Sequence, residues 1–168
     1  MKQRQQIAST LQRLKTIGSG LCLVLGLMLW VQQASAAVCT VTPVVAPVFA
    51  SYQGVQTDAT GSITVVCTSL LPESVSYTVR LGLSSQAVGT QRQMALGAGR
   101  LSYNFFCTNG YSQVWADGSG GTCVAPGGGT VLVLFPLVTA YTVYGRIPGG
   151  QLAAAGTYTD TVAIQVLY

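Results

Sequence analysis

The chain has 168 residues, of which 49% are hydrophobic and 7% are charged, with a formal net charge of +4 and no histidine. The lack of histidine excludes the Ser-His-Asp and Cys-His sets of nucleophilic catalysis. The excess positive charge all lies before residue 37, in Lys2, Arg4, Arg13 and Lys15, and the later charges balance. We therefore expect no surface for nucleic acid or anionic membrane.

Residues 1–36 have the pattern of a secretory signal peptide. The basic first segment leads into an apolar run from Leu21 to Val31, and Ala34-Ser35-Ala36 supplies the small residues of a cleavage site. The apolar run is too short for a retained membrane anchor. The sequence therefore predicts cleavage before Ala37 and an exported domain over residues 37–168, with no membrane attachment after cleavage.

Four cysteines follow the predicted leader: Cys39, Cys67, Cys107 and Cys123. An even number in an exported chain predicts two disulfides. Three pairings are open, and we favour Cys39–Cys67 with Cys107–Cys123 because each closes a short segment between neighbouring strands. A zinc site is disfavoured, since there is no Cys-x-x-Cys pair and no histidine. We expect no metal and no other cofactor.

The exported part has few charges, abundant Gly, Thr, Ser and Val, and no helical periodicity, which together indicate an all-β domain. Short segments of alternating or β-branched character are separated by turn signals, as in a β-sandwich of immunoglobulin-like type. The predicted strands cover residues 38–49, 62–68, 75–83, 92–94, 101–106, 130–138, 140–145 and 161–168. We expect residues 53–61 to form turns. We expect residues 108–129 to form a long Gly- and Ser-rich connection stapled by Cys107–Cys123.

The last predicted strand alternates cleanly, with Val162, Ile164, Val166 and Tyr168 on one face. No further segment follows that could pair beside it. The sandwich is therefore expected to be incomplete, lacking its last strand, and an open sheet edge must be covered or used for pairing.

Other side chains that could carry chemistry or binding are few. Asp117 and Asp160 are a poor candidate for a glycosidase acid pair, so we expect no enzyme activity. Tyr111 and Trp115 lie in the Gly-rich connection and are either exposed binding aromatics or, as we favour, packed over the core. Arg146 is a candidate ion-pair partner of Asp160. Leu70-Leu71 and Leu134-Phe135 are apolar sites for either the core or a binding tip.

Several short motifs together resemble a known family. They are RQM (92–94), LSYN (101–104), VWADG (114–118), YGRIP (144–148) and GTYTDT (156–161), followed by the alternating last strand. The first cysteine and the cysteine that ends the second strand also match. These features resemble the spore coat protein U family, which includes the pilin subunits of archaic (Csu-type) chaperone–usher pili. The early Phe-Gly of that family is Phe49-Ala50 here.

The resemblance implies an immunoglobulin-like fold without its final strand. In that family a periplasmic chaperone lends a strand, and the amino-terminal extension of a neighbouring subunit later replaces it during assembly at an outer-membrane usher. The partner-strand groove would then be lined by Val162, Ile164, Val166 and Tyr168. The expected route runs through the periplasm to a pilus on the cell surface, with roles in attachment and biofilm formation.

One departure from the family pattern concerns the donor extension. Cleavage before Ala37 leaves Ala37 and Val38 ahead of Cys39, and two residues reach about 7 Å at most. Such a subunit would accept a strand without donating one, which predicts a minor subunit at the pilus tip. The alternative is a secreted spore-coat or matrix protein that closes its own sandwich with residues 40–49.

Overall fold

The computed structural model describes residues 37–168, so the predicted signal peptide lies outside the described residues. The described part is built from eight β-strands. They are β1 (Val38–Val45), β2 (Thr57–Thr68), β3 (Glu73–Leu81), β4 (Arg92–Leu96), β5 (Gly99–Phe106), β6 (Ala125–Val131), β7 (Leu137–Ile147) and β8 (Ile164–Leu167). Within residues 37–168 no helix is long and apolar enough to cross a membrane.

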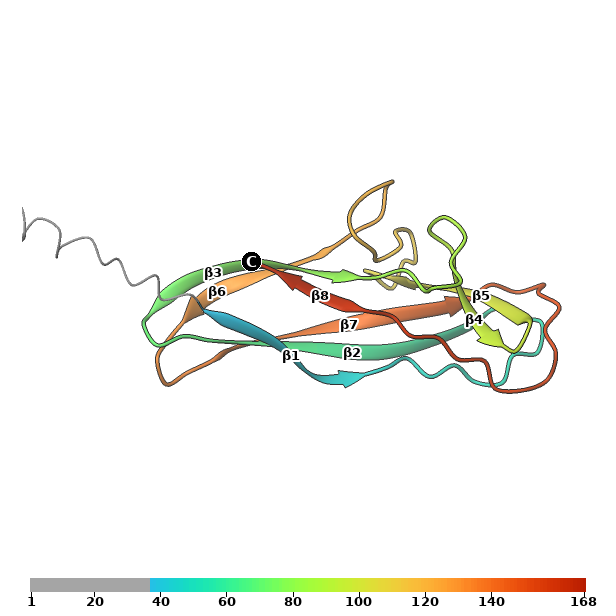
Figure 1. Cartoon of the computed structure of the whole chain (residues 1–168), viewed down its shortest axis with the longest axis horizontal. Helices are drawn as coiled ribbons and strands as arrows, with labels where there is room; N and C mark the ends of the chain where they lie inside the picture. The colour runs from blue at the N-terminus through green and yellow to red at the C-terminus, as the bar shows by residue number, and fades with distance from the viewer. Residues whose placement is uncertain (1–36) are drawn as a thin grey trace, which may run out of the picture. The chain divides into compact units, whose positions relative to one another are not determined.

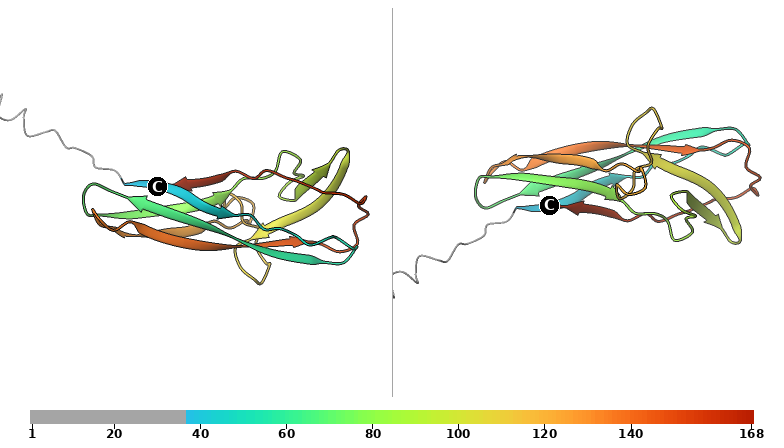
Figure 2. Two further views of the ribbon diagram at one scale, coloured as in Figure 1. Left: turned by 90° about the horizontal axis from the view of Figure 1, so that it is seen from below. Right: turned by 90° about the horizontal axis from the view of Figure 1, so that it is seen from above.

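The strands form two antiparallel sheets that face each other (Figures 1 and 2). The larger sheet has the order β1-β2-β7-β5-β4, and the smaller has the order β6-β3-β8. This arrangement confirms the predicted all-β sandwich. β8 is hydrogen-bonded to β3 along one edge, and within residues 37–168 no strand pairs with its other edge.

The core follows from side chains that alternate between the two faces of each strand. In β3, Tyr77, Val79 and Leu81 are at most 3% exposed, and they meet the equally buried Ile63 and Val65 of β2. The clear alternation predicted for β3 is therefore correct, although the strand ends at Leu81. The next apolar residue of the pattern, at position 83, is exposed.

β2 extends beyond its predicted limits. Residues 53–61 were expected to form turns, but β2 begins at Thr57, and Thr57 to Gly61 pair with Ile147 to Val143 of β7. This end of β2 pairs with β7 alone, because the register with β1 reaches only to Ser62. The β7 ladder satisfies backbone groups on that side whatever the side chains are. The polar composition of this segment was therefore misleading.

β6 lies in the segment that the sequence predicted as a connection. It carries Pro126 and three glycines, and it occupies an edge of the smaller sheet, where a missing N–H is tolerated. A Cβ at Gly127 would collide with the ring of Tyr77 and with the Tyr141 hydroxyl. Glycine here admits the Tyr77–Tyr141 pair between the sheets, whose hydroxyl oxygens lie 3.3 Å apart.

The structure forms both disulfides, Cys39–Cys67 and Cys107–Cys123, which is the pairing that the sequence favoured. The second disulfide staples the connection between β5 and β6. Trp115 in this connection is 1% exposed, and its indole Nε1 donates a hydrogen bond to the Val79 carbonyl oxygen at 2.9 Å. Trp115 is therefore a core residue, and its reading as an exposed binding aromatic is wrong.

Candidate functional site

The open edge of β8 presents backbone groups of defined residues. The Gly82 amide donates to the Ala163 carbonyl oxygen at 2.8 Å, and the strand then continues in register with β3. Hydrogen bonding alternates along an antiparallel ladder. Gln165 and Leu167 therefore direct their N–H and C=O groups toward β3, while Ile164 and Val166 direct theirs toward the open side.

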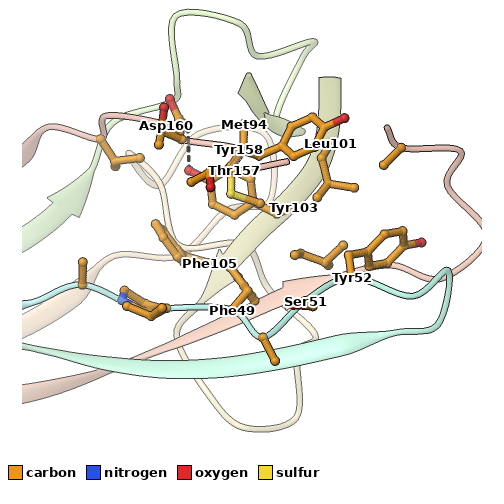
Figure 3. Close-up of a pocket in the computed structure, with 18 of the residues that line it drawn as sticks. Phe49, Ser51, Tyr52, Met94, Leu101, Tyr103, Phe105, Thr157, Tyr158 and Asp160 are labelled. Atoms are coloured by element: carbon orange, nitrogen blue, oxygen red, sulfur yellow. Dashed lines mark hydrogen bonds between the residues drawn. The ribbon is translucent and has the colours of Figure 1, made fainter. Parts of the chain in front are cut away.

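A groove of about 950 Å³ runs beside this edge, between β8 and the segment that follows β1. β1 approaches β8 near the C-terminus, and the groove opens where the chain continues beyond β1 (Figure 2). One wall is formed by residues 44–54 and the other by residues 153–164, and Figure 3 shows the aromatic floor between them. The floor residues are Ile63, Leu81, Met94, Leu101, Tyr103, Phe105, Val143 and Ile147. We call this depression the β1–β8 groove.

The structure places only some of the predicted groove residues in the groove. Val162, Ile164 and Val166 are half-buried and pack against the main core, and the first two line the groove. Tyr168 follows the end of β8 and is 65% exposed, and it is not among the lining residues. Regular strand geometry starts at Ile164 rather than at residue 161.

The wall opposite β8 was not predicted from the sequence. Phe49 lies edge-to-face on Tyr103, with ring centroids 6.0 Å apart, and the Tyr52 hydroxyl donates to the Pro148 carbonyl oxygen at 2.9 Å. Gly145 admits the Phe49 ring, which comes within 2.7 Å of the position of a Cβ there. The available signal was the apolar character of residues 44–49, but the prolines in this stretch remove the alternation that would assign a face.

Two polar groups adjoin the apolar floor. The Tyr103 hydroxyl donates to Asp160 Oδ2 at 2.5 Å (Figure 3). Burial and this hydrogen bond raise the pKa of Tyr103 above its ordinary value, so the phenol remains a donor. The arrangement satisfies the polar atoms at this end of the groove and leaves the rest of the floor apolar.

Arg92, the first residue of β4, is fully buried. Its Nη2 donates to the carbonyl oxygens of Gly82, Leu81 and Trp115 at 2.7, 3.1 and 2.8 Å. Its guanidinium also lies 5.5 Å from the centroid of the Phe105 ring. Burial lowers the pKa of Arg92 from its ordinary value. Arg92 therefore joins the end of β3 to the larger sheet and to the stapled connection.

Arg146 does not pair with Asp160, contrary to one expectation. It forms a two-point contact with Asp58, with Nε–Oδ1 and Nη2–Oδ2 distances of 2.7 and 2.8 Å. Its guanidinium also lies 3.4 Å from the centroid of the Tyr111 ring. One face of that ring is thus covered, and the Tyr111 side chain is half-buried. The contacts of Tyr111 fix the stapled connection to the sheet. Surface binding by Tyr111, the less favoured of its two predicted roles, stays a prediction.

Residues 37–168 offer no cluster of three or more side chains suited to a metal ion. Asp117 accepts hydrogen bonds from the amide and hydroxyl of Ser119 in its own turn, and these bonds lower its pKa. Asp160 is engaged by Tyr103. The β1–β8 groove instead combines an apolar floor with a row of outward-facing backbone groups, which suits an extended peptide strand.

The model of the spore coat protein U domain matches residues 27–165. The chain belongs to the spore coat protein U domain family. Its match covers the described sandwich from β1 into β8, so the β1–β8 groove lies wholly within the family domain. A search of curated proteins found none with significant similarity to this chain.

One solved structure has a similar fold at 20% sequence identity and a TM-score of 0.50. It is the crystal structure of the CsuC–CsuE chaperone–tip adhesion subunit pre-assembly complex from archaic chaperone-usher Csu pili of Acinetobacter baumannii. The alignment covers 79% of this spore coat protein U domain chain and 40% of the other chain, so it spans less than half of that protein. At this identity the likeness concerns the fold.

Proposed function

We propose that this protein is a structural subunit of a chaperone–usher pilus that accepts a partner's strand in the β1–β8 groove. The observation that carries the proposal is the open edge of β8 beside an apolar groove. A donor strand running between β1 and β8 forms hydrogen bonds with the backbone of Ile164 and Val166. Every second side chain of the donor enters the groove.

The expected energy of strand uptake is large compared with the stability of the domain. Each apolar side chain buried in the groove contributes about 1.5–3 kcal/mol. About four such side chains contribute roughly 6–12 kcal/mol, while a whole domain of this size is stable by about 5–15 kcal/mol. The subunit therefore gains much of its stability from its partner, which explains a need for a chaperone before assembly.

The partners follow from this requirement. A periplasmic pilus chaperone supplies the first strand, and a neighbouring pilus subunit replaces it at an outer-membrane usher. Residues 1–36 direct export, and the mature subunit passes through the periplasm to the cell surface. The family membership and the fold of the Csu complex support this assignment.

We further propose a place at the pilus tip. Cleavage before Ala37 leaves an arm that reaches about 7 Å, too short to fill a neighbour's groove. Amino-terminal sequencing of the exported protein tests this step. A first residue at or near Ala37 is expected, whereas cleavage upstream of residue 30 would leave a usable donor arm and exclude the tip assignment.

Two exposed apolar loops support a role in attachment and biofilm formation. The β2–β3 loop carries Leu70 and Leu71, which are 84% and 56% exposed, and the β6–β7 loop carries Leu134 and Phe135 at 82% and 69%. Both loops lie at the end of the sandwich where β1 begins (Figure 1). If the donor arm runs antiparallel to β8, the body of the donating subunit lies at the opposite end of the sandwich. These loops then face away from the rest of the pilus.

The alternative of a self-closing coat or matrix protein uses residues 40–49 as the covering strand. In the described fold, β1 instead pairs with β2 from Val38 to Val45. The chain then continues along the far wall of the groove, where Phe49 packs on Tyr103. This placement favours the strand-accepting function.

A strand supplied in the same chain tests the proposal. The extension follows Tyr168 with an Asn-Gly turn and about nine residues of alternating Val and Thr, a length typical of a strand. The matched control replaces each Val of the extension by Ser. We expect the Val extension to raise the free energy of unfolding by several kcal/mol over the Ser extension. Equal stabilities would refute the proposal.

A further inference from the structure

The two walls of the β1–β8 groove meet on one floor side chain. Tyr103 of β5 is 2% exposed and contacts the first wall through the edge-to-face pair with Phe49. Its hydroxyl reaches the second wall at Asp160. A second edge-to-face pair with Phe105, with centroids 5.1 Å apart, fixes the ring from the floor. Figure 3 shows Tyr103 between the two walls.

The bond to Asp160 holds the wall where its backbone leaves one sheet for the other. Thr159 exchanges two backbone hydrogen bonds with Ala95 of β4, at 2.9 and 3.1 Å. Contact with the smaller sheet begins at Ala163, whose carbonyl accepts from Gly82. Asp160 lies between these anchors. Its Oδ1 accepts from the Thr161 amide at 2.8 Å, which orients Oδ2 toward Tyr103.

We propose that Tyr103 is a positioning residue that sets the separation of the two walls before a strand enters. The inference rests on the proposed strand-accepting function. The hydrogen bond to Asp160 holds the segment leading into β8 at the spacing that the Phe49 contact defines on the other side. The outward-facing groups of Ile164 and Val166 are thereby in place when the donor arrives, and less ordering entropy opposes binding.

The test measures binding of a fluorescein-labelled peptide with the alternating Val and Thr sequence described above. Tyr103→Phe keeps both ring contacts and removes the hydroxyl, and we expect the affinity to fall about tenfold to a hundredfold, as for a lost hydrogen bond to a charged group. Tyr144→Phe is the matched control, because Tyr144 lies outside the groove lining. We expect that change to leave the affinity within about twofold.

Asp160→Ala removes the same hydrogen bond from the other partner. It provides a second measurement if Tyr103→Phe folds poorly. If one hydrogen bond is responsible, the double variant binds the peptide no more weakly than the weaker single variant. Additive losses would overturn the inference. So would wild-type affinity in either single variant.

Amide exchange in the strand-free protein separates positioning from a general loss of stability. Tyr103→Phe is expected to speed exchange over residues 160–163 and to leave the core of β2 unchanged. Uniform acceleration across the domain would overturn the positioning role. A wild-type protein that fails to bind the peptide would contradict the proposed function itself, whereas normal binding by all variants would contradict this inference alone.

Discussion

Replacement of Arg92 by Met is expected to destabilise the domain strongly. The change removes a fully buried guanidinium while keeping an unbranched apolar stem. Three carbonyl oxygens lose a donor: those of Leu81 and Trp115, whose bonds are buried, and that of Gly82, whose bond is partly buried. Each orphaned group costs about 1–3 kcal/mol. The relief of guanidinium desolvation offsets part of this cost, which leaves a net loss of about 3–5 kcal/mol.

The assay is urea unfolding of the oxidised, strand-free protein, followed by tryptophan fluorescence. Arg100→Met is the matched control, because Arg100 also donates to two carbonyl oxygens, those of Gly97 and Gly99, but lies exposed at a turn. We expect the control to lose less than about 1 kcal/mol. Equal losses in the two variants would refute the view that Arg92 joins the sheets through buried carbonyls.

Three further changes address other parts of the molecule. Gly127→Ala places a Cβ against the tyrosine pair and should cost about 1–3 kcal/mol in urea unfolding, whereas Gly110→Ala, with its nearest neighbour atom at 3.7 Å, should cost less than 1 kcal/mol. Equal costs would contradict the packing account. The arginine hydrogen bond lowers the pKa of Asp58 below 3.8, so Asp58→Asn should cost about 0.2–1 kcal/mol at pH 7. This difference should vanish as the pH falls through the lowered value, and a difference that persists in acid would contradict the ion pair. Leu134→Asp should reduce retention on polystyrene severalfold with an unchanged melting temperature, since it removes exposed apolar area from the loop at the end of the sandwich. The control Val88→Asp changes a 69% exposed site in another loop, and this variant should bind polystyrene as well as the unchanged protein does. Equal retention of the two variants on polystyrene would contradict the attachment role.

Strands with one buried face could be predicted from the sequence. The alternation of β3 and of residues 101–106 reflects a core on one side only, and the inward set of Val162, Ile164 and Val166 follows from the same rule. Most of β6 escaped prediction because its glycines fit distant neighbours rather than strand propensity: Gly127 faces the tyrosine pair, and Gly128 lies against the backbone of Val75. Local composition carries no record of those contacts.

Partners of polar side chains were also beyond the sequence. Asp58 and Arg146 are direct cross-strand partners in the β2–β7 register, and this register fixes the ion pair. Arg92 gave no sign of burial, since its hydrogen bonds go to backbone carbonyls of segments remote in sequence. The far wall of the groove was missed because prolines interrupt its pattern.

Amide exchange along β8 tests the central claim most directly. In the strand-free mature protein, the amides of Gln165 and Leu167 should be protected by β3, and those of Ile164 and Val166 should exchange rapidly. Addition of the alternating Val and Thr peptide should then slow exchange at Ile164 and Val166. Protection of these two amides in the strand-free protein, equal to that of Gln165, would contradict an open edge on β8.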